Sequence, residues 1–509
     1  MTTRRDNLVF AAIVGAYFVF LATVFWNSSR VIAGERFFGL GDDALISMRY
    51  ARNFADGHGL VWNAGERAVE GYTNLLWVFV MAAVHLLPLA VSKTSAVVQV
   101  LSLSLLVANL FVTRNLARAI GAGAAGSIGA ALLTALYYPL NAWSMQGSEL
   151  ALLVPVIGLA VLLAIRGVAA ERFSSVPFWL LGAATLVRLD AGVVYLGLLA
   201  GLTAVDRSRR RAHLAHGIGV LLLFTAAQTA FRLGYYGEWL PNTYYLKMTG
   251  YPAIWRIAWG IRDFAGFVWH HIGIAVAFAA IGLYRYRRPG AIVAAAALAQ
   301  FGYAAYIGPA DNRFTTLAMP LVFALAAPGV EVVVAAAAAR GWISTRREAI
   351  YASLALAAVG AWMFNAEALR FRRFSDDVLA RDRLIERLTT PEASVAVSAA
   401  GTLYYLDRPG VDVLGKNDYT LARERVHRSF RAFRAGYVSG HMKWDYAYSI
   451  GTLAPDVVAE LWRYPEDAAP YLQEYEPLQF RDETLYLRRG SRRIRWDRLP
   501  SLQASASQR

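Results

Sequence analysis

The sequence predicts a polytopic α-helical membrane protein, with about 11 transmembrane helices, that ends in a C-terminal α/β domain on the outer side of the membrane. Two observations predict the membrane part. Of the 509 residues, 57% are hydrophobic, and the apolar residues gather in runs of roughly 17–25, the length that crosses about 30 Å of hydrocarbon. The third observation is a change after about position 367, from apolar runs to charged helical and short β-rich segments.

The apolar runs predict the spans in chain order. The first run follows a short basic segment, as in a signal peptide, but it is longer than a usual apolar signal region and no small-residue cleavage site follows, so we interpret it as a retained span. Segment 177–205 is long enough for two short helices, which brings the expected crossings to eleven. The predicted spans are about 8–26, 95–113, 119–138, 150–166, 177–187 with 191–205, 213–231, 266–285, 291–307, 314–339 and 349–366.

Arginine-bearing loops orient these helices. The net charge of +15 would indicate nucleic acid in a soluble protein, but most arginines here fall in short loops between spans, such as "DRSRRR" at 206–211, so no nucleic-acid partner is expected. All these loops face the cytoplasm if the apolar segment 74–90 is re-entrant or interfacial, which is the interpretation we prefer. If 74–90 spans instead, the basic segment 113–118 falls outside and the pattern breaks. The preferred topology has the N-terminus inside and the C-terminus outside.

This topology gathers the polar loops on the outer face. Arg188 and Asp190 lie in the middle of 177–205, where an ion pair is too costly to face lipid. They predict two short helices that turn near the outer surface and line a polar cavity. The outer loops are 27–73, 141–149, 188–190, 232–251 and 308–314.

The chain is expected to divide into a membrane domain at 1–366 and a soluble α/β domain on the outer side at 367–500, followed by a disordered tail at 501–509. The membrane domain includes the first outer loop and the segment 74–90. In the soluble domain, "ASVAVSAAGTLYYL", "VDVLG" and "ETLYLRRG" predict strands, and "APDVVAELWRY" predicts a helix.

Asp42 and Asp43 open a predicted helix in "GDDALISMRYARNFADG". An acid at this position commonly caps the helix and interacts favourably with its macrodipole, but only one of the two can be the cap. The following loop also holds Glu66 and Glu70 among several basic residues. This density of ionisable groups at a membrane face favours a site, in which a carboxylate acts as general base on a hydroxyl or as a ligand of a cation.

Polar residues in the other outer loops each have a structural and a functional interpretation. Glu149, Arg188 and Asp190 form either a structural salt-bridge group or a site in which Arg188 binds a phosphate and Asp190 holds the arginine. Arg313 is either a snorkelling arginine at the end of a span or a second phosphate contact.

The segment "YYGEWLPNTYYLK" mixes aromatic residues with Glu, Asn and Lys. An aromatic belt at the membrane interface explains part of it, and tyrosine and tryptophan faces beside amides also suit a sugar. In the soluble domain, His441, Lys443 and Asp418 lie in short polar motifs after predicted strands and are candidates to face the membrane site. No metal-ligand spacing stands out, and the chain has no cysteine.

The run "GDDALISMRYARNFADGHGLVWNAGERAVEGYTNLLW" resembles the first periplasmic loop of GT-C type membrane glycosyltransferases. The resemblance is strongest to the branch that includes the mycobacterial cell-wall arabinofuranosyltransferases adding terminal arabinose. Further stretches agree in order along nearly the whole chain: "WSMQGSELAL", "LVRLDAG", "YYGEWLPNTYYLK", "GTLYYLDRPGVDVLGKND" and "SGHMKWDY".

The resemblance implies a polyprenyl-phosphate sugar donor that enters from the outer leaflet, and a catalytic acidic pair in the first outer loop. It assigns Asp42 and Asp43 as catalytic, one activating the acceptor hydroxyl and the other positioning it or holding a divalent cation. Arg188 and Arg313 are then the donor-phosphate contacts. The further substrate-binding candidates are Glu70, Glu149, Asp190, Tyr244, Tyr245, Lys247 and His441.

The expected function is transfer of a sugar, arabinofuranose by resemblance, from polyprenyl phosphate to a cell-envelope glycan or glycoconjugate at the periplasmic face of a bacterial inner membrane. Two alternatives remain open. A transporter or flippase of lipid-linked sugars predicts polar residues on both membrane faces and repeat symmetry. A non-catalytic envelope-assembly subunit tolerates the loss of both acids.

Overall fold

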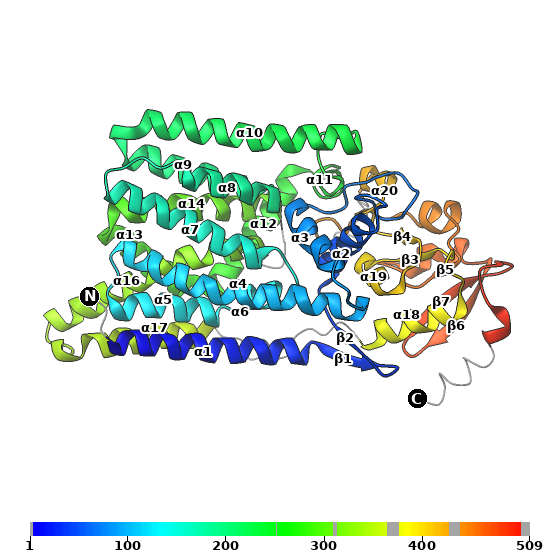
Figure 1. The fold of residues 1–509 in the computed structure, drawn as a ribbon, viewed down its shortest axis with the longest axis horizontal. Coiled ribbons are helices and arrows are strands. Elements are labelled where there is room, and N and C mark those ends of the chain that lie inside the picture. The colour runs from blue at the N-terminus through cyan, green and yellow to red at the C-terminus, as the bar shows by residue number, and fades with distance from the viewer. Residues whose placement is uncertain (1–3, 251, 309–312, 364–375, 427–437, 500–509) are drawn as a thin grey trace. The chain divides into compact units, whose positions relative to one another are not determined.

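The computed structural model describes residues 4–250, 252–308, 313–363, 376–426 and 438–499 (Figure 1). Two compact units follow from the contacts within the chain. The helical unit comprises Met1–Asn27, Gln99–Gln228 and Ala253–Phe371, and the mixed unit comprises Ser28–Val98, Thr229–Pro252 and Arg372–Arg509. Domain boundaries at 366 and 500 stay a prediction. The predicted tail at 501–509 lies outside the described residues.

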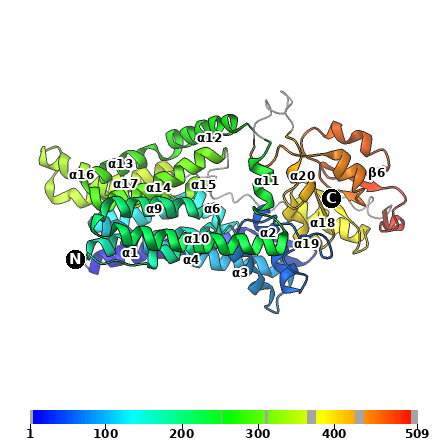
Figure 2. The same ribbon diagram turned by 90° about the horizontal axis from the view of Figure 1, so that it is seen from above.

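The helical unit is a bundle of α-helices (Figures 1 and 2). Helices α4 and α10 contribute to both units. The helices of this unit are α1 (Arg4–Asn27), α4 (Val91–Ile120), α5 (Ala124–Leu136), α6 (Tyr138–Met145), α7 (Leu150–Ala169), α8 (Val176–Val187), α9 (Ala191–Val205), α10 (Arg210–Tyr236), α12 (Ala253–Phe267), α13 (Gly273–Arg285), α14 (Arg287–Ile307), α15 (Arg313–Thr316), α16 (Met319–Ala339) and α17 (Glu348–Met363).

The predicted class of polytopic helical membrane protein is confirmed. Seven helices within the described part of the chain are long and apolar enough to cross a membrane. The predicted spans fall mainly on helical residues, although 266–285 covers the end of α12 as well as α13, and 314–339 covers α15 and α16. The segment 177–205 forms two short helices, α8 and α9, joined at residues 188–190 as expected. The number of eleven crossings stays a prediction. Helices α5, α8 and α9 have 13, 12 and 15 residues. At 1.5 Å per residue they extend only about 18–23 Å, which is less than the thickness of the hydrocarbon core.

Small residues let the helices of this unit approach closely. A Cβ added to Gly282 of α13 would lie 2.1 Å from the carbonyl oxygen of Leu325 in α16, and one added to Gly329 of α16 would lie 1.9 Å from the carbonyl oxygen of Phe278. A Cβ added to Gly197 of α9 would lie 2.6 Å from the carbonyl oxygen of Ala295 in α14. Membrane helices pack through such small residues because lipid supplies little hydrophobic drive for helix association.

The mixed unit contains a hairpin, several short helices and a sheet. The hairpin strands β1 (Ser29–Ile32) and β2 (Glu35–Phe38) pair antiparallel around Ala33 and Gly34, both with positive φ, as a tight two-residue turn requires. The helices are α2 (Asp42–Ala55), α3 (Leu75–His85), α11 (Asn242–Met248), α18 (Asp376–Leu388), α19 (Leu403–Leu406) and α20 (Tyr419–Arg423).

The sheet of the mixed unit has the strand order β4-β3-β5-β7-β6. Strand β3 pairs parallel with β4 and with β5, whereas β7 pairs antiparallel with β5 and β6. The helix predicted for "APDVVAELWRY" is wrong: Val457 and Val458 are strand β5, buried between β3 and β7, where β-branched side chains fit best. The strands are β3 (Val395–Val397), β4 (Gly410–Asp412), β5 (Val457–Val458), β6 (Tyr475–Phe480) and β7 (Glu483–Arg488).

The apolar segment 74–90 contains α3, which has only 11 residues. A helix of this length extends about 16 Å, roughly half of the hydrocarbon thickness. Residues Trp77, Val78 and Met81 on one face of α3 are buried in the mixed unit. The depth of this segment in the bilayer stays a prediction.

Candidate functional site

The acids Asp42 and Asp43 occupy the first turn of α2, and neither of them caps the helix. The N-cap is Gly41, with extended backbone (φ −72°, ψ 158°) and no side-chain capping hydrogen bond. The expectation that one acid caps α2 is therefore wrong. Neither carboxylate is used in capping, so both can contact other parts of the protein. Their charges still interact favourably with the helix macrodipole.

Asp42 accepts a hydrogen bond from the backbone N–H of Gly401 at 2.7 Å on Oδ1. The surrounding protein and, secondly, repulsion from Asp43 raise the pKa of Asp42 to about 7, while Lys416 and the Gly401 N–H act in the opposite direction. Asp42 is itself exposed to solvent, which weakens the effect of burial on its pKa and leaves more of the shift to the repulsion from Asp43. A carboxyl group with this pKa exchanges protons near neutral pH.

Asp43 forms an ion pair with Lys416 through its Oδ1 atom. The Lys416 side chain is largely buried and that of Asp43 is partly exposed, at 17% and 42%. No group of three His, Asp or Glu side chains that suits a metal ion occurs among the residues with described positions. Since an ammonium group already neutralises Asp43, the donor set here does not fit the divalent cation considered from the sequence.

Arg49 anchors α2 within the mixed unit. Its guanidinium donates to the carbonyl oxygens of Trp62, Leu403 and Arg408 and to the Asn63 amide oxygen, at 2.7–3.0 Å. A buried arginine is tolerated only when its donors are satisfied in this way. The helix that carries the two acids is thus held by the loop that follows it and by the C-terminal part of the chain.

Glu70, a substrate-binding candidate, is buried and pairs with Arg232 of α10. The Arg232 Nε–H donates to Glu70 Oε2 at 2.7 Å. Burial raises the pKa of Glu70 to about 7, although the positive charge of Arg232 acts to lower it. The neighbouring Gly71 has no room for a side chain, since an added Cβ would lie 2.0 Å from the Asn417 amide oxygen. Glu70 therefore holds the first outer loop in place.

The aromatic segment around α11 divides into exposed and engaged side chains. Tyr244 is 40% exposed. Tyr245 lies under the Arg423 guanidinium, 4.0 Å from the ring centroid, and Glu238 pairs with the same arginine at 3.1 Å. Lys247 lies within electrostatic range of His441. Tyr244 is thus the exposed candidate of this segment, whereas Tyr245 is engaged by Arg423.

The polar motifs in the C-terminal part of the chain have different surroundings. Lys443 is fully buried and donates to three acceptors, the Tyr245 and Ala422 carbonyl oxygens and the Thr249 hydroxyl, at 2.7–3.1 Å. Asp418 caps α20 by accepting from the Leu421 N–H. Both have structural contacts. His441 packs against Trp462, and burial together with Lys247 lowers its pKa, so its ring is neutral at neutral pH.

The helical unit contains a cluster of charged side chains at the ends of α7, α8, α9 and α15. It consists of Glu149, Arg188, Asp190 and Arg313. Arg188 donates in a bidentate manner to Asp190 and through Nη1 to Glu149, all at 2.8 Å. Arg313 donates to the same Glu149 oxygen at 2.8 Å. Two guanidinium and two carboxylate groups balance in charge. These ion pairs agree with the structural interpretation and also with the functional one, in which Asp190 holds Arg188, and a phosphate would have to share the two arginines with Glu149.

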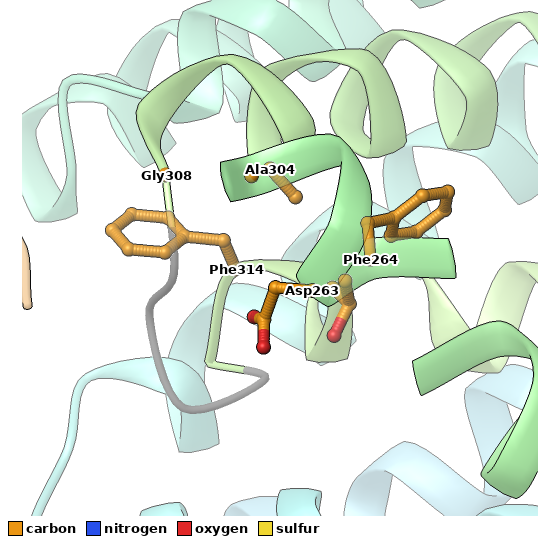
Figure 3. A pocket seen from close by; sticks show the side chains of 7 residues that line it. Asp263, Phe264, Ala304, Gly308 and Phe314 are labelled. Carbon is orange, nitrogen blue, oxygen red and sulfur yellow. The ribbon is translucent and has the colours of Figure 1, made fainter. Parts of the chain in front are cut away.

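A small cavity lies in the helical unit (Figure 3). Its volume is about 20 Å³, and its lining includes Asp263 and Phe264 of α12 and Phe314 of α15. The Phe314 ring in turn lies 4.8 Å from the Arg188 guanidinium. This volume holds about one water molecule, so the cavity is too small for a sugar.

The fold has counterparts of known structure. The crystal structure of ArnT from Cupriavidus metallidurans in the apo state matches 94% of this chain and 97% of ArnT, with TM-score 0.56 and 14% identity. The structure of the same protein bound to undecaprenyl phosphate matches 96% of this chain and 98% of ArnT, with TM-score 0.57 and 16% identity. The Archaeoglobus fulgidus oligosaccharyltransferase matches with TM-score 0.54 and 12% identity, over 96% of this chain and 74% of that one. The fold is therefore that of the GT-C membrane glycosyltransferases.

The chain is also similar in sequence to a relative of known activity. The terminal beta-(1->2)-arabinofuranosyltransferase of Corynebacterium glutamicum is 27% identical over 355 residues, which is 60% of this chain. The chain spans about half the length of this curated relative, 49% of which is matched. No family model matches the chain. The resemblance drawn from the sequence, to GT-C enzymes and their terminal arabinofuranosyltransferase branch, is confirmed by these matches.

Three residues that matter for the candidate site were not predicted. Lys416 contacts Asp43, Gly401 contacts Asp42 and Arg232 contacts Glu70. The segment "GVDVLGKND" was recognised as a polar loop after a strand, but its lysine carried no separate signal. A basic residue in a loop at the carboxyl end of a predicted parallel strand is the one pattern that would have identified Lys416.

Proposed function

We propose that the protein is a membrane glycosyltransferase that moves a sugar, arabinofuranose by similarity, from a polyprenyl-phosphate donor to a hydroxyl group of a cell-envelope glycan or glycoconjugate. The observation that carries the proposal is the acid pair of α2, in which Asp42 has a pKa of about 7 beside an Asp43 that is paired with Lys416. The GT-C fold and the arabinofuranosyltransferase relative supply the reaction class.

In this proposal Asp42 is the general base. Its carboxylate takes the proton of the acceptor hydroxyl, the hydroxyl oxygen forms a bond to the anomeric carbon, and the bond between that carbon and the phosphate oxygen breaks. Polyprenyl phosphate leaves with the bonding electron pair. A carboxyl with a pKa of about 7 is a stronger base than an ordinary aspartate and is still ionised in half of the molecules at that pH. The rate should therefore rise with pH through about 7.

Arg188 and Arg313 are the proposed contacts of the donor phosphate. Arg188 is held by Asp190 in a bidentate pair, whereas Arg313 is the more exposed of the two, with 15% of its side chain accessible against 7%. A planar guanidinium suits a phosphate leaving group because it places two donors on its oxygens. Glu149, which both arginines share, would hold them in place before the phosphate arrives. Tyr244, Lys247 and His441 are the proposed sugar contacts.

The proposed location is the bacterial inner membrane, with the acid pair on the periplasmic face. The support comes from the arginine-rich loops, which favour a cytoplasmic side opposite the first outer loop. A polyprenyl-phosphate donor in the outer leaflet would then be reached from within the membrane plane.

The test is an assay of the purified protein in lipid nanodiscs with polyprenyl-phosphate arabinofuranose and a panel of glycan acceptors. Asp42→Asn should lower kcat by about 10²–10⁴, the usual contribution of a general base, and Asp43→Asn should also reduce transfer. Asp482→Asn, which alters an exposed acid in the turn between β6 and β7, is the matched control and should be active.

Three outcomes contradict parts of this proposal. Full transfer by both Asp42→Asn and Asp43→Asn would remove the acids from the site. A wild-type protein that consumes no polyprenyl-phosphate sugar is not a transferase of this class. Movement of the intact donor across a bilayer without cleavage would instead identify a flippase, and mass spectrometry of the lipid product separates these cases.

A further inference from the structure

The parallel part of the sheet in the mixed unit has a feature common to ligand-binding α/β domains. Strand β3 has β4 on one side and β5 on the other, and all three run in the same direction. The chain thus leaves β3 toward one neighbour and later returns to the other. In open parallel sheets, ligands bind outside the carboxyl ends of the strands at such a switch point.

The loops at this edge of the sheet contact the two acids of α2. Gly401, in the turn after β3, donates its N–H to Asp42 at 2.7 Å. Lys416, in the loop after β4, pairs with Asp43. Glu460, directly after β5, lies within electrostatic range of Asp42. Each of the three parallel strands therefore delivers one group to the acid pair.

The loop that carries Lys416 is fixed from two sides. Asp412, at the end of β4, accepts hydrogen bonds from the backbone N–H groups of Leu414, Gly415 and Asn417 at 2.8–3.1 Å. From the other side, the Asn242 amide donates to the carbonyl oxygens of Gly415, Lys416 and Asp418 at 3.0–3.2 Å. A side chain held by a loop with so many internal contacts is preorganised.

We propose that Lys416 is a positioning residue of the transfer reaction: its ion pair holds Asp43 as a carboxylate and leaves Asp42 as the member of the pair that takes the acceptor proton. The C-terminal part of the chain thereby completes the reaction centre of the first outer loop. The inference rests on the proposed function. It assigns separate tasks to two adjacent acids that the sequence alone does not distinguish.

The charges around Asp42 and Asp43 determine the direction in which each neighbour shifts the pKa of Asp42. Asp43 and Glu460 raise the pKa of Asp42, and Lys416 lowers it. Arg381 neutralises Glu460 through an ion pair of 2.7 Å. His441 and Lys247 stand on the side of Asp43 and Lys416, and the histidine is neutral at neutral pH. The strongest partners of Asp42 are therefore Asp43 and Lys416, which act in opposite directions.

Because Asp43 and Lys416 act in opposite directions, removal of either charge should shift the acidic limb of the kcat/KM pH profile in opposite directions. Lys416→Met removes a positive charge, so the acidic limb should move to higher pH by about half a unit or more, and kcat at pH 7 should fall about twofold or more because fewer Asp42 side chains are ionised. Asp43→Asn removes a negative charge, so the limb should move to lower pH. Lys416→Arg keeps the charge and should retain the wild-type limb. The KM for the donor should change by less than about threefold in Lys416→Met.

A second readout does not require turnover. Infrared difference spectroscopy follows the carboxylic-acid band of Asp42, identified by its loss in Asp42→Asn, as the pH is changed. The midpoint should rise in Lys416→Met and fall in Asp43→Asn. Arg489→Met removes a surface positive charge of the same sheet, paired with Glu476, and should leave the midpoint unchanged. If Lys416→Met does not fold, Asp43→Asn and Lys416→Arg still carry the test.

The outcomes separate this inference from the proposed function. An Asp42 midpoint that does not respond to Lys416→Met overturns the inference, whether or not the protein is active. A raised donor KM with an unmoved pH limb also overturns it, because Lys416 would then contact the donor itself. Opposite shifts of the midpoint together with a wild-type protein that transfers no sugar would support the coupling and contradict the proposed function.

Discussion

At the scale of single residues, Gly401 allows the acid pair to sit against the sheet. An added Cβ at this position would lie 2.3 Å from the backbone oxygen of Asp42 and 2.7 Å from its Oδ1. Atoms do not approach that closely, and the obstructing atom is backbone, so the first turn of α2 or the turn after β3 would have to move. The hydrogen bond from Gly401 to Asp42 depends on this close contact.

Gly401→Ala should therefore reduce transfer by at least about tenfold while the fold is retained, because a displacement of about 1 Å at a reacting group is enough for such a loss. Steady-state kinetics and the thermal unfolding midpoint of the same preparation measure the two effects. Gly234→Ala is the matched control, since nothing lies within 4 Å of a Cβ added there and alanine favours the interior of α10. Equal activity of Gly401→Ala and wild type would show that the geometry of Asp42 is not critical.

The residues of the site differ in how far the sequence predicts them. Two adjacent acids at the start of a helix and near a membrane face are recognisable locally. Their partners are not, because Gly401 and Lys416 lie 359 and 373 positions further along the chain. The capping expectation failed for a related reason: local statistics favour an acid as the cap, but the distant Gly401 engages Asp42, and Gly41 takes the cap position.

At the scale of elements, the pair of Glu70 and Arg232 connects the first outer loop to the end of α10. Both side chains are nearly inaccessible, at 4% and 7%. The pKa of Glu70, about 7 in the folded protein, lies above its ordinary value of 4.5. The folded state therefore binds the proton more tightly than the unfolded state. The resulting stabilisation is complete below pH 4.5 and is lost as the pH rises to about 7.

Glu70→Gln should remove this pH dependence. Between pH 5 and pH 8 the wild type should lose a contribution on the order of 3 kcal/mol, and the variant should lose much less, as judged from thermal unfolding midpoints at both pH values. The exposed Glu474→Gln should behave as the wild type. If the difference between pH 5 and pH 8 is the same in Glu70→Gln as in the wild type, Glu70 is ionised at both.

The sequence predicts most helices of the helical unit but not the ion pairs that connect their ends. Charged residues in the middle of an apolar run are expensive in lipid, so Arg188 and Asp190 correctly marked the turn between α8 and α9. The same logic does not reveal that Glu149 binds both Arg188 and Arg313. The false helix at β5 shows the limit for short segments, since two buried valines fit either structure until their neighbours are known.

At the scale of the whole molecule, orientation in the membrane depends on one short segment. If α3 and its flanks at 74–90 do not cross, the arginine-rich loops all lie in the cytoplasm; if they cross, every later loop changes side. Helix α3 has 11 residues, and its face with Trp77, Val78 and Met81 is buried within the mixed unit, which favours the first arrangement. The same segment thus decides on which side the loop between α7 and α8 lies.

Single cysteines should decide this orientation, because the chain has none of its own. A cysteine at the exposed Ala170, between α7 and α8, should react with a membrane-impermeant maleimide only after the membrane is permeabilised. A cysteine at the exposed His58, in the first outer loop, should react in sealed right-side-out vesicles. If the impermeant maleimide labels both Ala170→Cys and His58→Cys from outside, segment 74–90 spans the membrane. Labelling of Ala170→Cys but not His58→Cys from outside would invert the protein and place the acid pair in the cytoplasm, contrary to the proposed periplasmic reaction.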